Sequence, residues 1–227
     1  MYTLHMKFSF GSPDKKPDKS IDALEELRLS REAGNVAGLA EDHIKYLEEQ
    51  HETEGLTGLK TRKVFDRELE AALGLLSGKI QERRAHAEAP KVVSVIMVDL
   101  DDFKKINDTR GHAVGDAVLR SVAEVISECV RASDTAARYG GEELVVLMPG
   151  ATAKVAAQHA EDIRARIEQL TFDQYPDLRV TGSLGIAEVT EVHENDESDV
   201  LVKNADRAMY EAKANGKNRV EIYQGGR

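Results

Sequence analysis

The chain has 227 residues, of which 41% are hydrophobic and 32% charged, so it is long enough for one globular domain with its own core and a smaller appendage. Its formal net charge of -10 repels a polyphosphate backbone at long range, which excludes broad nucleic-acid binding unless a local basic patch overrides it. No apolar stretch approaches the roughly 18 residues that a membrane-spanning helix needs, and no secretion signal begins the chain, so a soluble, cytoplasmic protein is expected.

Residues 1–54 are expected to form a mainly helical segment that precedes the main domain. A short β-like start and a loop with prolines lead into helical patterns. In the second of these patterns, Ala40, Ile44 and Leu47 form one apolar stripe on an acidic rod. This stripe either packs on the chain's own domain or pairs with a second chain, so we interpret the segment as a signalling, dimerising or docking element.

Residues 55–227 alternate between strand and helix patterns, which favours an α+β fold with helices packed on a mixed central sheet. The run over 92–100 is almost continuously apolar and β-branched, as expected of a strand buried on both faces. Further on, the pair Gly140-Gly141 indicates a hairpin between two strands. In chain order we expect a helix over 64–76, a strand over 92–100, a helix over 113–130, strands over 135–139 and 144–148, a helix over 152–170, a strand over 178–189, a helix over 199–215 and a strand over 219–223.

Acidic residues stand where two of these strands meet their turns. Asp99 and Asp101 close the apolar run over 92–100, and an aspartate there is either a helix cap or a metal ligand. Taken alone, Asp101 favours capping of a following turn. Glu142 and Glu143 follow the glycine pair of the predicted hairpin. Two such carboxylate clusters at neighbouring strand ends suit Mg²⁺, although a solvated acidic rim explains the spacing equally well.

Several spaced motifs follow one another in order along the main domain. They read DLDDFKKIND at 99–108, GHAVGD at 111–116 and RYGGEEL at 138–144. Together they resemble the GGDEF family of diguanylate cyclases, and the similarity covers about residues 55–223, which implies that family's palm-like βααββαβ core. The shorter matching runs are LTGL at 56–59, VTGSLGIA at 180–187 and, within 205–218, AD followed by KANGKN.

The resemblance implies a diguanylate cyclase, which condenses two GTP molecules into cyclic di-GMP and releases two pyrophosphates. It implies that Asp99, Glu142 and the carbonyl of Leu100 bind Mg²⁺, with Mn²⁺ as an alternative, and that Glu143 assists them. Glu142 also matches the acceptor of the proton from the attacking 3'-hydroxyl. Because one domain of this family binds one GTP, a homodimer is implied for catalysis.

The same resemblance assigns the contacts to GTP. Asn107 and Asp116 match the residues that read guanine, and Phe103 and His112 belong to the same matched motifs. A carboxylate suits this role because it can accept from N1–H and N2–H of guanine, whereas adenine offers no such pair of donors. The triphosphate contacts are implied for three lysines that would otherwise be interpreted as a solvated helix face, namely Lys104, Lys213 and Lys217.

Arg131 and Asp134 precede the hairpin at the family's RxxD spacing, which implies a site for product inhibition by cyclic di-GMP. Without the resemblance, the two residues would be interpreted as an ordinary surface pair at a helix end. Relatives often carry a further arginine on the next helix, where this chain has Gln158 and Asp162, so inhibition is expected to be weaker or built differently. A second departure is Leu144, where the family usually has phenylalanine; an apolar exchange is tolerable there.

The sequence thus leads to one main hypothesis and one alternative. The main hypothesis is an active cyclase, because the full acidic and guanine-reading set is present. The alternative is a catalytically weak member that acts as a receptor for GTP or cyclic di-GMP. The expected partners are GTP, cyclic di-GMP and a second copy of the chain, and neither a nucleic-acid polymer nor a membrane is expected.

Overall fold

A six-stranded mixed sheet forms the centre of the computed structural model, which describes residues 52–79, 89–191 and 197–225. The strand order is β1-β3-β4-β2-β5-β6. Strand β2 pairs antiparallel with β4 and β5, whereas the two edge strands pair parallel to their neighbours. The strands are β1 (Lys60–Thr61), β2 (Val93–Leu100), β3 (Thr135–Arg138), β4 (Glu143–Pro149), β5 (Gly182–Val189) and β6 (Val220–Ile222).

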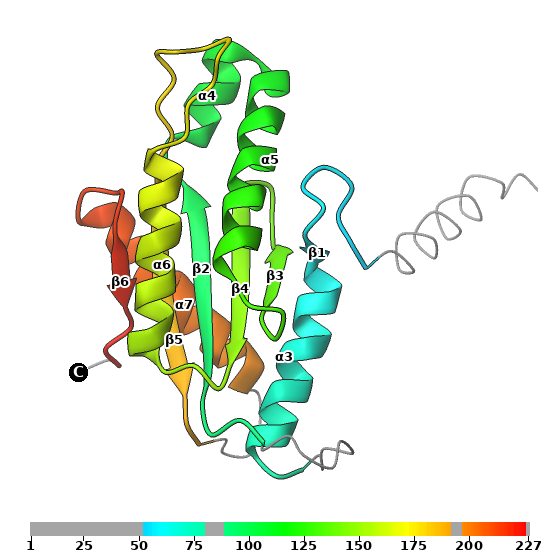
Figure 1. Ribbon diagram of the computed structural model, residues 1–227. Coiled ribbons are helices and arrows are strands. Elements are labelled where there is room, and N and C mark those ends of the chain that lie inside the picture. The colour runs from blue at the N-terminus through cyan, green and yellow to red at the C-terminus, as the bar shows by residue number, and fades with distance from the viewer. Residues whose placement is uncertain (1–51, 80–88, 192–196, 226–227) are drawn as a thin grey trace, which may run out of the picture. The chain divides into compact units, whose positions relative to one another are not determined.

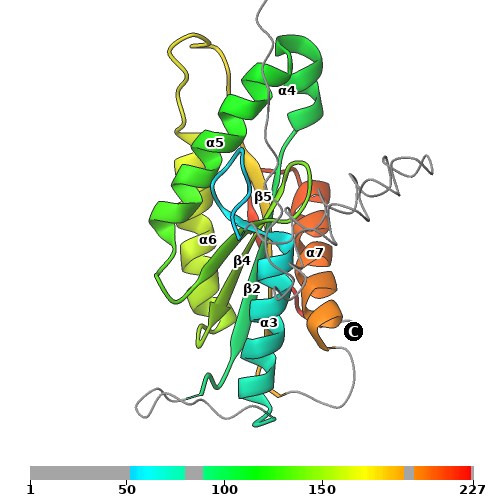
Figure 2. The ribbon, with the colours of Figure 1, turned by 90° about the vertical axis from the view of Figure 1, so that its right-hand side faces the viewer.

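Helices cover both faces of this sheet (Figures 1 and 2). Helices α5 (His112–Cys129) and α6 (Ala153–Glu168) lie on one face, and α3 (Arg62–Leu76) and α7 (Glu197–Ala214) lie on the other. The short helix α4 (Phe103–Arg110) follows directly after the end of β2. This arrangement confirms the predicted α+β fold with a mixed central sheet flanked by helices.

The alternation of side chains along β2 divides the core into two layers. Ile96, Val98 and Leu100 pack with α5 and α6, whereas Met97 packs with α3 and α7. Every residue of β2 is buried, as a continuous apolar run predicts for a strand covered on both faces. The same alternation turns Asp99 toward α7, so a carboxylate enters the layer that otherwise holds apolar side chains.

Most elements expected from local patterns are confirmed with ends shifted by a few residues, but the start of β5 and helix α4 differ, and the two-residue strand β1 was not expected. The strand expected over 178–189 begins later, at Gly182, because its partner strand β2 ends at Leu100, opposite Gly182, and the chain then turns into α4. Helix α4 was not expected from a local pattern and was implied only by the resemblance, whose βααββαβ core has two helices after this strand. Of its residues only Phe103 and Ile106 are buried, which is too few to produce a helical pattern in the sequence.

The segment predicted over residues 1–54 lies almost entirely outside the described residues, which begin at Glu52. Among the helices of the described ranges, none is both long enough and apolar enough to cross a membrane.

Candidate active site

Asp99 is a nearly buried carboxylate at the end of β2, with 5% of its surface exposed. Its Oδ1 lies 2.8 Å from Nζ of Lys213, which belongs to the last turn of α7. The contact is an ion pair whose angles are poor for a hydrogen bond, and no residue in the described part of the chain donates a well-aligned one to this oxygen. Burial raises the pKa of Asp99, and Lys213 opposes that rise. Oδ1 of Asp99 therefore already faces the positive charge of Lys213 and can also accept a metal cation.

The turn between β3 and β4 brings two more carboxylates to the same place. In the register of β2 with β4, Glu143 stands opposite Asp99. Burial raises the pKa of Glu142, and the charge of Asp99 raises it further. A Cβ at Gly140 would lie 2.4 Å from Oε2 of Glu143, so a larger residue there would displace this carboxylate. The predicted catalytic carboxylates thus meet at neighbouring strand ends.

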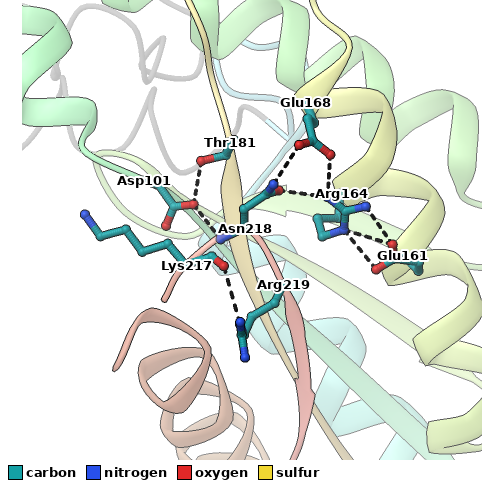
Figure 3. A network of polar contacts seen from close by, with 8 residues as sticks. All are labelled: Asp101, Glu161, Arg164, Glu168, Thr181, Lys217, Asn218 and Arg219. Carbon is teal, nitrogen blue, oxygen red and sulfur yellow. Dashed lines mark hydrogen bonds and ion pairs between the residues drawn. The ribbon is translucent and has the colours of Figure 1, made fainter. Parts of the chain in front are cut away.

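Asp101 does not cap α4, which corrects the expectation from the sequence. Its buried carboxylate accepts from the hydroxyls of Thr181 and Ser183, both at 2.7 Å, and from the backbone N–H of Asn218 at 3.0 Å. Asp102 holds the N-cap position of α4 instead. Two hydroxyls and an N–H that converge in a buried place outcompete the exposed end of a short helix. Asp101 therefore joins the end of β2 to the turn after α7 (Figure 3).

Two of the three lysines predicted to contact a triphosphate face this acidic cluster. Lys213 contacts Asp99, and Nζ of Lys217 lies 2.6 Å from Oδ1 of Asp102 at the start of α4. Lys104 lies on the exposed side of α4. The end of α7 and the turn after it therefore supply positive charge next to the strand-end carboxylates, where a phosphate ligand needs it.

Helices α4 and α5 bring the predicted guanine contacts together. A Cβ at Gly115 would lie 2.0 Å from Oδ1 of Asn107 and 3.1 Å from Cζ of Phe103, so glycine allows α4 and α5 to approach closely. Oδ1 of Asn107 is buried and receives no hydrogen bond from any residue that the structure describes. Asp116 lies partly exposed on α5, and His112 is exposed at its first position. A buried amide oxygen without a donor offers a place for an N–H group of a ligand.

Sequence reasoning missed a pair that holds the hairpin turn, Glu54 and Arg138. Arg138 donates to the carbonyl of Gly140 at 3.2 Å, to the carbonyl of Gly141 at 2.7 Å and to Glu54 at 3.0 Å. Glu54 also accepts from the N–H and the hydroxyl of Thr57, at 2.9 and 2.7 Å. The only signals in the sequence are that Arg138 begins the motif RYGGEEL and that Glu54 shortly precedes the motif LTGL. The pair links the entrance of the domain to its acidic turn.

Replacing Glu54 with glutamine is expected to lower the free energy of unfolding by about 1 kcal/mol, the usual worth of a partly exposed charged hydrogen bond. Burial alone would raise the pKa of Glu54, but Thr57 and Arg138 hold it below its ordinary value of 4.5. The stability it contributes is therefore present above pH 4.5 and is lost as the pH falls through the lower folded-state value. Urea unfolding measures the loss. Glu52→Gln, at exposed ion pairs with Lys60 and Arg67, should leave stability nearly unchanged, and equal losses in both variants would contradict the assignment.

Comparison with known proteins decides the family. Residues 51–219 match the family model described as diguanylate cyclase, GGDEF domain. The chain belongs to the GGDEF family. This confirms the resemblance seen in the motifs.

Individual relatives agree with the GGDEF assignment. Diguanylate cyclase A of Treponema denticola is 38% identical over 192 residues, which are 83% of this chain and 49% of that protein. Diguanylate cyclase DgcM of Escherichia coli K12 is 38% identical over 181 residues, or 78% of this chain and 40% of that one. The chain thus spans half or less of these curated relatives. The crystal structure of the GGDEF domain of DgcB from Caulobacter crescentus in complex with c-di-GMP has a TM-score of 0.67 and 33% identity, and the match covers 78% of this chain and 98% of that chain.

The acidic site of this GGDEF domain fits a divalent metal ion by the chemistry of its donors. Within the described ranges, no three His, Cys, Asp or Glu side chains form a metal cluster by themselves. Mg²⁺ needs no such cluster, because it binds through one or two carboxylates and takes further oxygens from waters and substrate phosphates. Asp99 and Glu142 can supply the two carboxylates, and the contact with Lys213 shows that Asp99 already faces a cation.

Arg131 and Asp134 lie in the turn between α5 and β3, at the opposite end of β3 from the GGDEF hairpin. Oδ2 of Asp134 accepts from the backbone N–H of Arg131 at 3.0 Å, so this aspartate shapes the turn and the arginine side chain is exposed. An open pocket of about 350 Å³ borders Asp134. On α6, Gln158 and Asp162 are both exposed.

Proposed function

We propose that this chain is an active diguanylate cyclase that condenses two GTP molecules into cyclic di-GMP. The observation that carries the proposal is the meeting of Asp99, Glu142 and Lys213 at the end of β2 and its neighbouring hairpin. A buried carboxylate and a partly exposed one, both with raised pKa values and both beside a lysine, are costly to keep, and such groups cluster at catalytic sites. A receptor for nucleotides has no need of this arrangement.

In the proposed reaction, the 3'-oxygen of one GTP attacks the α-phosphorus of the other, a new phosphorus–oxygen bond forms and pyrophosphate leaves. Asp99, the Leu100 carbonyl and Glu142 would hold Mg²⁺, which when bound offsets the negative charge of the transferring phosphate. Glu142 accepts the proton of the attacking hydroxyl. Lys213 and Lys217 contact the triphosphate. Each domain holds one GTP, so two copies of the chain face each other during the reaction.

Purified protein is expected to convert GTP with Mg²⁺ into cyclic di-GMP and pyrophosphate, as followed by chromatography, and to leave ATP unchanged. Removal of the metal with EDTA should stop the reaction. The rate per molecule should rise with protein concentration, because two domains must meet. If no product forms at high concentration after bound nucleotide is stripped, the cyclase proposal fails. The receptor function is then favoured, and cyclic di-GMP binding by the wild type and Arg131→Ala tests it.

Replacing Asp116 with serine is expected to reduce the preference for GTP over ATP by at least about tenfold, because the carboxylate that accepts from guanine is lost. The buried Oδ1 of Asn107 supports a guanine site beside it. Competition between GTP and ATP in the chromatographic assay measures the preference. Asp108→Ser, at an exposed position of the neighbouring helix α4, is the control. Unchanged base preference in the Asp116 variant would remove this residue from the guanine site.

Feedback inhibition by cyclic di-GMP is the second part of the proposal, and it assigns the product to Arg131 and Asp134. The exposed side chain of Arg131 supports it, because arginine can bind phosphate or guanine with paired hydrogen bonds, and so does the open pocket that Asp134 borders. Gln158 and Asp162 bring no further positive charge from α6, so weak inhibition is expected. The substrate GTP places the proposed reaction in the cytoplasm.

A further inference from the structure

Helix α6 carries none of the residues assigned to the active site. One of its arginines nevertheless contacts the turn after α7, which carries the predicted triphosphate contact Lys217. Arg164 is 15% exposed at its side chain, although it lies on a surface helix. Its Nε and NH2 groups donate to Glu161 at 2.9 and 2.7 Å, and its NH1 group donates to Glu168 and Asn218 at 2.7 and 2.8 Å (Figure 3). The two glutamates of α6 therefore orient the guanidinium, and Asn218 is its contact outside the helix.

Both ends of the Asn218 side-chain amide are held. Oδ1 accepts from Arg164, and Nδ2 donates to Glu168 at 2.9 Å. Lys217 and Asn218 have φ angles of +63° and +46°, in the left-handed region that L-residues visit at a cost. Two consecutive residues in that region need support from outside the turn. Arg164 and Glu168 of α6 supply this support by holding the Asn218 amide from both ends, and we call this pair the clamp.

The clamped turn then contacts the end of β2. The backbone N–H of Asn218 donates to Asp101, which directly follows Leu100, and Nζ of Lys217 reaches Asp102. A shift of Asn218 would therefore move Lys217 relative to the end of β2. Asn218 thus links α6 by hydrogen bonds to the turn that carries the predicted triphosphate lysine.

We propose that Arg164 and Glu168 are positioning residues for the triphosphate of GTP, which act by holding the amide of Asn218 and with it the direction of Lys217. This inference rests on the proposed function, because it takes Lys217 as a phosphate contact. The hydrogen bonds from Arg164 and Glu168 offset the strain of the left-handed turn in the free protein. The ammonium group of Lys217 is therefore in place before the nucleotide binds. The binding of triphosphate, and not the chemical step, should depend on it.

Arg164→Gln is expected to raise KM for GTP about fivefold to tenfold while kcat changes less than about twofold, since an interaction made equally in ground and transition states affects KM alone. The Kd for a GTP analogue with a methylene group between the α and β phosphorus atoms should rise by the same factor. Arg166→Gln is the matched control, because Arg166 lies on the same helix and makes an exposed ion pair with Glu128. Its KM should remain that of the wild type.

Two further variants guard against a simple folding defect. Asn218→Gly keeps the backbone N–H and tolerates a positive φ but removes the clamped amide, so its KM should rise as in Arg164→Gln. In a Lys217→Met background, Arg164→Gln should add less than about twofold to KM. Equal KM values for Arg164→Gln and Arg166→Gln, or a full additional effect without Lys217, would overturn the inference. A wild type that makes no cyclic di-GMP but binds the analogue would overturn the proposed function instead, and the Kd values would still test the clamp.

Discussion

Replacing Gly185 with alanine is expected to lower the free energy of unfolding by about 3 kcal/mol or more, at the upper end of the cost of overpacking. A Cβ at this position of β5 would lie 2.0 Å from the backbone nitrogen of Met209 and 2.2 Å from the carbonyl oxygen of Ala205. These atoms belong to the backbone of α7, so no side-chain rotation relieves the clash and the whole helix must move outward. Because α7 carries Lys213, the ion pair with Asp99 should loosen as well.

Gly182→Ala is the matched control on the same strand. A Cβ there would lie 3.6 Å from the nearest atoms, which is ordinary van der Waals contact. This variant should stay within about 0.5 kcal/mol of the wild type, helped by the smaller entropy of the unfolded chain. Urea unfolding followed by circular dichroism compares the two. If both glycines tolerate alanine equally well, α7 does not lie against β5 as closely as the structure shows.

The fold could be predicted from the sequence wherever an element carries its own pattern. The continuous apolar run of β2 and the glycine pair before Glu142 are local signals, and both are confirmed. The start of β5 and helix α4 were not predictable in this way. Strand β5 begins opposite Leu100, where its partner β2 ends, and α4 buries only two side chains. The start of β5 is therefore set by a strand that is distant in the sequence, whereas α4 leaves too little apolar pattern to be detected.

The candidate site shows the same division. Asp99, Glu142 and Asn107 could be found because they lie within short contiguous motifs, and what those motifs assign to them stays a prediction until activity is measured. The two pairs that support the site could not be found. Glu54 and Arg138 are 84 residues apart, and Arg164 and Asn218 are 54 apart. Such polar pairs have no periodicity, so only the folded chain shows which residues meet.

Replacing Glu142 with glutamine is expected to slow cyclic di-GMP formation at least about a hundredfold, the usual contribution of a positioned general base. Glutamine has nearly the same shape, so the hairpin keeps its geometry, but it can neither accept the proton nor offer a charged ligand to Mg²⁺. Initial rates at saturating GTP measure the effect. Glu188→Gln is the control, because this carboxylate of β5 accepts from the N–H of Ala153 at the start of α6 and takes no part in the proposed chemistry.

The stability of the metal-free Glu142→Gln variant should not fall with its activity. Burial raises the pKa of Glu142, Asp99 and Glu143 raise it further, and Lys213 opposes them. A group whose folded-state pKa is raised adds stability below its ordinary pKa, here 4.5, and loses that contribution as the pH rises through the folded-state value. At pH 7 the variant should therefore be at least as stable as the wild type. The difference should vanish below about pH 4.5.

These opposite directions separate a catalytic role for Glu142 from a structural one. A residue kept for the architecture of the hairpin would lose stability and activity together, as Gly185→Ala is expected to do through the displacement of α7. A residue kept for chemistry loses activity while the fold gains from the removal of a repelled charge. Loss of both in Glu142→Gln would assign this glutamate to the hairpin, and retention of both would require another acceptor for the 3'-hydroxyl proton. The proposed mechanism requires that Glu142→Gln loses activity but keeps the stability of the wild type.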